Sequence, residues 1–82
     1  MKPVESDRLD AEERRELSSS DFGIPEERAF PMPDAAHVRA AEAYFRYASD
    51  HQKPELARNI LEKAAEYGVR VESPVVLSWA GK

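Results

Sequence analysis

The residue pair best suited to acid–base chemistry in this sequence is Asp34 and His37, which lie three positions apart. On a helix this spacing places both side chains on one face, where a carboxylate can orient an imidazole. Catalysis by such a pair also needs a nucleophile and an oxyanion-binding loop, and neither accompanies it here. Asp34 is better explained as the N-cap of a helix, so we predict no catalytic residues and expect a protein that is not an enzyme.

Metal and cofactor sites are not predicted either. The chain has no cysteine, which excludes disulfides, thiolate catalysis and a Cys-rich zinc site. The acidic residues follow the solvent faces of the predicted helices, and no segment matches a calcium loop, a zinc-protease helix or a phosphate-binding loop. His51, the second histidine, lies in a polar turn and is expected to be solvated. We therefore expect neither a metal nor a cofactor.

Nucleic acid is the less favoured kind of partner. The formal net charge is −4, whereas binding to phosphates requires clustered Lys and Arg. A helix-turn-helix would use residues 54–67 for recognition, but that segment carries three glutamates against two basic residues. Its polar residues available for reading bases are Arg58, Asn59 and Lys63. Another basic face, containing Arg28, Arg39 and Arg46, keeps DNA binding open as an alternative.

Two helices are predicted to position these side chains. The first spans about 34–49 and is capped by Asp34, with apolar residues at helical spacing on one face. The second spans about 54–67, with Pro54 suited to its first turn and Gly68 to its C-terminal cap. Because the turn between them is short, the helices are expected to form an antiparallel hairpin.

The segment before the helices, residues 22–33, combines large apolar side chains with three prolines. Proline fixes φ and favours extended geometry in the preceding residue, which predicts a stiff, extended, polyproline-like strap with a turn at Pro25-Glu26-Glu27. Two interpretations stay open for its apolar residues: packing across the helices, or exposure as anchors for a partner. The apolar residues concerned are Phe22, Ile24, Phe30 and Met32.

The two ends of the chain have contrasting compositions. Residues 1–21 are polar and charge-rich, which predicts an arm that is disordered or partly helical from about Ser6. The last residues are rich in valine, which predicts a short strand or hairpin. Trp79 could either clamp the core or contact a partner.

These observations predict a mainly α fold. It consists of an antiparallel two-helix hairpin (about 34–49 and 54–67), a proline-rich N-terminal strap, optionally a short N-terminal helix, and a short β strand or hairpin at the C-terminus. Residues 1–21 are assigned to the polar arm, and 22–82 to a single small domain. No apolar run reaches the roughly 18–20 residues of a membrane span, and no signal-peptide core is seen, which predicts a cytoplasmic protein.

The strap and the start of the first helix resemble a small domain of unknown function in tailed-phage and prophage proteins. The resemblance covers about residues 9–68 and follows the pattern R-x-L…F-x-x-P-x-x-R-x-aromatic-P-x-x-D-x-x-H-x-x-x-A. The matching residues are Arg14/Arg15, Leu17, Ser20, Phe22, Pro25, Arg28, Phe30-Pro31, Pro33-Asp34, His37-Val38-Arg39 and Ala41. Residues 45–68 are similar in their aromatic pattern. That domain occurs alone or at the ends of larger proteins, some of them head or prohead-maturation components, and the resemblance implies no activity.

We therefore expect a non-enzymatic, phage-type protein-interaction module, namely a virion-assembly or head-associated accessory protein. The alternatives are a small acidic inhibitor of a host or defence enzyme, and a DNA-binding helical domain. The expected partner is another protein, with self-association left open and no membrane partner; the expected location is the host cytoplasm or the virion. The residues predicted to contact the partner are Phe22, Ile24, Arg28, Phe30, Met32, Arg39, Arg46, Val76 and Trp79.

Overall fold

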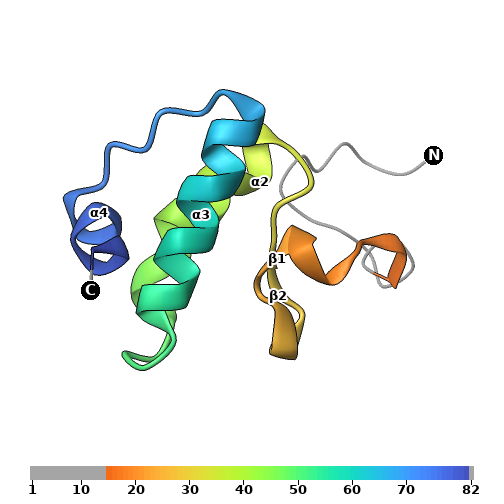
Figure 1. Cartoon of the computed structure of the whole chain (residues 1–82), viewed down its shortest axis with the longest axis horizontal. Helices are drawn as coiled ribbons and strands as arrows, with labels where there is room; N and C mark the ends of the chain where they lie inside the picture. Colours follow the sequence, from red (N-terminus) through yellow and green to blue (C-terminus); the bar gives the residue numbers. More distant parts are fainter. Residues whose placement is uncertain (1–14, 82) are drawn as a thin grey trace.

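The computed structural model describes residues 15–81 of the chain. A small antiparallel β-hairpin comes first, and three α-helices follow it (Figure 1). In chain order the elements are the 3₁₀ turn η1 (Ser19–Asp21), β1 (Phe22–Ile24), η2 (Pro25–Glu27), β2 (Ala29–Pro31), α2 (Ala35–Tyr44), η3 (Phe45–Tyr47), α3 (Lys53–Tyr67) and α4 (Pro74–Ala80). Most of the optional helix from Ser6 lies outside the described residues; Arg15 and Glu16, which are described, are helical.

The predicted fold class is wrong, because it places the β structure at the opposite end of the chain. Residues 22–33, expected to form an extended strap, contain both strands of an antiparallel hairpin. The register pairs Phe22 with Pro31 and Ile24 with Ala29. Proline is tolerated here because both strands of a two-stranded sheet are edge strands, where a missing N–H costs no ladder hydrogen bond.

Left-handed backbone at two non-glycine residues accompanies this hairpin. The η2 turn (Pro25–Glu27) is followed by Arg28, which has a φ of 48°. In β2, Phe30 has a φ of 59°. The turn predicted at residues 25–27 is therefore present, as η2. Because residues other than glycine seldom adopt positive φ, the sequence did not indicate that the chain reverses here and pairs the two flanking segments.

The valine-rich segment near the C-terminus is a helix, α4, and not the predicted strand or hairpin. The Ser73 hydroxyl accepts a hydrogen bond from the Val76 N–H at 3.3 Å, and Pro74 stands in the first turn. This Ser-Pro start favours a helix, whereas the β propensity of valine is a weak and context-dependent bias. The helix turns Val76 into the core, fully buried, and leaves Val75 exposed.

The helix α2 starts at its expected cap but ends early. The Asp34 carboxylate accepts a hydrogen bond from the His37 N–H at 2.9 Å. The predicted helix extends to residue 49, whereas α2 ends at Tyr44 and the chain continues as η3. The longer α3 ends before Gly68, which has a φ of 70°, a conformation that glycine adopts without a Cβ clash.

The helix α3 lies at the centre of the fold. The β-hairpin packs on one side of it, α4 packs on another, and α2 runs beside it in the opposite direction (Figure 1). Every one of these elements supplies side chains to the hydrophobic core. The buried members are Ile24, Met32, Val38, Ala41, Phe45, Leu56, Ala57, Ile60, Ala64 and Val76.

Side chains of α2 and α3 also form hydrogen bonds with the backbone of other parts of the fold. Asn59 in α3 donates a hydrogen bond to the Gly23 carbonyl in β1, over 2.9 Å. The Glu42 carboxylate in α2 accepts from the N–H groups of Glu72 and Ser73, at 3.2 and 3.1 Å. A carboxylate at the start of α4 also has the favourable sign for the helix dipole.

We expect Gly23→Ala to destabilise the domain by about 1–3 kcal/mol, since the hairpin packs closely on α3 at this residue. A Cβ atom at Gly23 would overlap the Cδ1 atom of the buried Leu56 and would lie 3.1 Å from the Cβ of Phe30. Urea unfolding followed by circular dichroism measures the change. Gly81→Ala is the control, because its nearest neighbour would be at 3.7 Å. Equal stability of the two variants would contradict the close packing of β1 on α3.

Candidate protein-interaction surface

Three of the apolar residues predicted to contact a partner lie in the interior. Phe22 is 1% exposed, Ile24 2% and Met32 0%. All three residues of β1 are buried, because β1 packs against α3 while its partner strand β2 lies against α2. For these three side chains the structure gives a packing role, the first of the two interpretations of the strap.

Arg28 and Phe30 in the same hairpin are half-buried. The Arg28 guanidinium donates a hydrogen bond to the Leu17 carbonyl at 3.1 Å and lies 4.5 Å from the centre of the Phe22 ring. Such a cation–π contact, together with a hydrogen bond, holds the arginine against the hairpin. Arg28 thus serves to join the segment before η1 to the strands.

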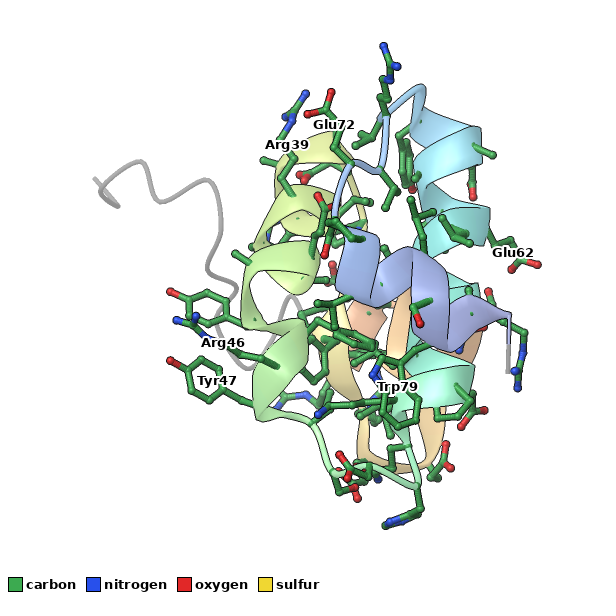
Figure 2. The ribbon with its side chains drawn as sticks, turned by 90° about the vertical axis from the view of Figure 1, so that its left-hand side faces the viewer. Arg39, Arg46, Tyr47, Glu62, Glu72 and Trp79 are labelled. Carbon is green, nitrogen blue, oxygen red and sulfur yellow. The ribbon has the colours of Figure 1, made fainter. Side chains whose placement is uncertain are left out.

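The three arginines of the proposed basic face do not form one surface. Arg28 faces the hairpin, whereas Arg39 and Arg46 are exposed on α2 and η3. Seven residues of helix place the latter two about 10 Å apart along the axis, and Figure 2 shows them projecting at separate levels. Within residues 15–81, the three arginines therefore give the DNA-binding alternative no contiguous cluster in its favour.

Two of the three residues that a helix-turn-helix would use for reading bases already have hydrogen-bond or ion-pair partners within the fold. Asn59 bonds to Gly23, and the Lys63 ammonium, 8% exposed, bonds to Asp21 and Glu66 at 3.0 and 3.2 Å. Burial on its own would lower the pKa of Lys63, but these two carboxylates raise it above its ordinary value. Only Arg58 of the three points to solvent.

The tail residues have contrasting environments. Val76 is fully buried in the core, and Trp79 is partly buried against it. The Lys53 ammonium lies 5.6 Å from the centre of the Trp79 ring, a cation–π contact that joins the end of α4 to the start of α3. Trp79 thereby acts at least as a clamp on the domain, one of the two roles considered for it.

Sequence reasoning missed the largest exposed aromatic residues. Tyr44 and Tyr47 are 56% and 69% exposed, and their ring centres are 6.1 Å apart. The Arg46 guanidinium lies 5.1 Å from the Tyr47 ring centre and donates a hydrogen bond to the Tyr47 hydroxyl at 3.2 Å. Figure 2 shows Arg46 and Tyr47 projecting together from one side of the molecule. Their spacing, Y-x-R-Y, was the available signal.

A shallow hollow of about 210 Å³ separates this aromatic group from α4. It is lined by Glu42, Ala43, Phe45, Arg46, Ser73 and Val75. Val75 is 52% exposed at its rim, and the neighbouring helix residue Leu77 is 47% exposed. We call Tyr44, Arg46, Tyr47 and Val75 the α2-end surface.

Asp34 caps the N-terminus of α2, as the sequence predicted, and also contacts the His37 ring. The His37 Nδ1 lies 2.8 Å from an Asp34 carboxylate oxygen, and the His37 side chain is 4% exposed. Partial burial raises the pKa of Asp34, but hydrogen bonds from the His37 ring and from the backbone outweigh it, so that the pKa lies below its ordinary value. The carboxylate is therefore ionised at neutral pH and accepts hydrogen bonds only.

Comparisons with known proteins gave no relative: no family model, no curated protein and no solved structure matches the chain. Within residues 15–81, no three His, Asp or Glu side chains gather in a way that could hold a metal ion. In the same part of the chain no helix has the length and apolar character to cross a membrane.

Proposed function

We propose that this protein is a non-enzymatic protein-interaction module that contacts its partner through the α2-end surface. The observation that carries this proposal is the exposure of two adjacent tyrosines, 56% and 69%, beside an arginine. Tyrosine and arginine are the residue types most often found at the energetic centres of protein interfaces. A small domain that leaves both on one edge has a surface suited to a partner.

The geometry of this surface supports the proposal further. The Tyr47 ring and hydroxyl hold the Arg46 guanidinium, so that little side-chain freedom is lost when a partner binds. The hollow beside Arg46 offers a recess between α2 and α4, and the exposed Val75 adds apolar area at its edge. Aromatic rings, a fixed cation and a recess together resemble the composition of an interface core.

Within this class we propose a virion-assembly or head-associated role, in the host cytoplasm or in the virion. This finer proposal rests on the resemblance of residues 9–68 to the phage and prophage domain. Its partner would be a capsid or head-maturation component. The absence of a membrane-spanning helix in residues 15–81 is compatible with these locations.

Affinity capture followed by mass spectrometry tests the proposal. The bait is the full chain, and the lysate comes from the source organism, with and without prophage induction. The double variant Tyr44→Ala/Tyr47→Ala is expected to weaken partner binding by at least about 30-fold, the effect of losing one hot-spot residue. The affinity is then measured with the purified partner.

Glu62→Ala is the matched control. Glu62 is exposed on α3 and lies on the other side of the molecule from Tyr47 (Figure 2). We expect it to retain the wild-type affinity. Two results would contradict the proposal: a partner that binds the tyrosine variant as tightly as the wild type, or no partner that distinguishes the two. A head component among the specific partners would support the finer role.

A further inference from the structure

A second recess lies between β2 and α2, next to the α2-end surface. Its volume is about 140 Å³, and its lining is chiefly apolar. The lining residues are Phe30, Pro31, His37, Ala40, Ala41 and Tyr44. A ring the size of benzene fits a cavity of about 150 Å³, so this recess has the volume of one aromatic ring. Tyr44 belongs both to the recess and to the exposed tyrosine pair.

The imidazole of His37 is the buried polar group of this lining. Its Nδ1 lies 2.8 Å from the Asp34 carboxylate, which is an acceptor only, so Nδ1 carries a proton. Asp34 is 57% exposed, whereas the Nε2 atom on the opposite edge of the ring is buried. In the neutral ring, Nε2 is a hydrogen-bond acceptor.

No residue in 15–81 gives this acceptor a hydrogen bond. The Nε2 atom of His37 is buried and lacks a partner, in contrast to the great majority of buried polar atoms in proteins. His37 lines the recess, and its Nε2 is a buried, unpaired acceptor, so an occupant gains affinity if it fills the recess and its donor reaches Nε2.

We propose that this recess receives a phenol ring, the side chain of a tyrosine in the partner protein, whose hydroxyl donates to His37 Nε2. Phenylalanine has the ring without the donor, tryptophan is larger than the space, and serine or threonine would leave most of it empty. Tyr44, one wall of the recess, is 56% exposed, so its side chain can move to admit the hydroxyl. This inference rests on the proposed function and names the partner's anchor residue.

Titration of the full chain with p-cresol, followed by NMR, tests the inference without the partner. We expect saturable shifts of the His37 Nε2 signal and of the Ala40 and Tyr44 amides. Toluene and 4-methylanisole, which have the ring but no donor, are expected to bind about tenfold more weakly, the effect of one hydrogen bond. Equal affinity for all three probes, or no saturable binding of p-cresol, would overturn the inference.

Two variants test separately how much the ring and the hydrogen bond contribute to binding. His37→Phe is expected to remove the preference for p-cresol over toluene, and Ala40→Leu, which fills the recess, to abolish the binding of both. If His37→Phe does not fold, Ala40→Leu and the comparison of the three probes still test whether the recess binds a phenol. Binding of p-cresol without any specific protein partner would count against the proposed function only. If a partner needs Tyr44 and Tyr47 but p-cresol does not bind, the role of the recess is wrong and the proposed function still holds.

Discussion

Phe45→Ala is expected to destabilise the domain by about 3–5 kcal/mol, the cost of removing a buried aromatic ring from a core. Phe45 is 2% exposed and belongs to the main hydrophobic cluster, at the point where α2 passes into η3. A domain of this size has a total stability of roughly 4–12 kcal/mol. The variant is therefore expected to lose a large share of its stability and to unfold at a much lower urea concentration.

Tyr47→Ala provides the control, two residues further on. Its ring is 69% exposed, and its contacts in the described residues are to Arg46 and Tyr44, so a change of about 0.5 kcal/mol is expected. Urea unfolding of both variants by circular dichroism measures the difference. If Phe45→Ala and Tyr47→Ala were equally stable, the assignment of one to the core and the other to the surface would be wrong.

Asp21→Ala is expected to destabilise the domain by about 3 kcal/mol, because it removes one partner of a buried ion pair. The Asp21 carboxylate lies 3.0 Å from the Lys63 ammonium, which is 8% exposed. Because Glu66 remains as a second partner of Lys63 at 3.2 Å, the expected cost lies at the lower end of the usual range, although Glu66, 52% exposed, is the weaker partner. Thermal and urea unfolding at pH 7 measure it.

The pH dependence of stability gives this pair a second readout. Partial burial raises the pKa of Asp21, but Lys63 and the Ser18 hydrogen bonds outweigh it and lower the pKa below 3.8. The unfolded chain then binds more protons in this range, so the stabilisation is complete above pH 3.8 and is lost as the pH falls through the folded value. Asp21→Ala is expected to make the free energy of unfolding fall less steeply at acid pH. The same acid dependence in the variant and the wild type would contradict a role for Asp21.

Signals confined to a few neighbouring residues could be interpreted from the sequence. Asp34 caps α2, and Gly68 ends α3, because each acts through hydrogen bonds or sterics within one helical turn. The β-hairpin was missed because it depends on distant partners such as Asn59, which bonds to Gly23 in β1. The α4 helix is not indicated by its valine content, because β propensity depends on context, whereas the cap at Ser73 is a local signal for a helix.

The exposure of Tyr47 could be derived from the sequence, but the candidate surface could not. On a uniform α-helix, at 100° per residue, Tyr47 lies about 200° round from the buried Phe45 and faces away from the core. The 3₁₀ turn after Tyr44, with 120° per residue, also leaves Tyr47 on the outside. The contact between the Arg46 guanidinium and the Tyr47 ring depends on side-chain conformations that the spacing Y-x-R-Y does not specify.

The central position of α3 has a consequence for cooperativity. The contacts of α3 extend to α2, η3, β1 and α4, so each of these elements covers part of the same helix. Opening any one of them exposes apolar surface on α3 and weakens the support of the others, which favours all-or-none unfolding. The amide protons of α3 should then exchange with solvent only through global unfolding, and the measured exchange rate would report the stability of the whole domain.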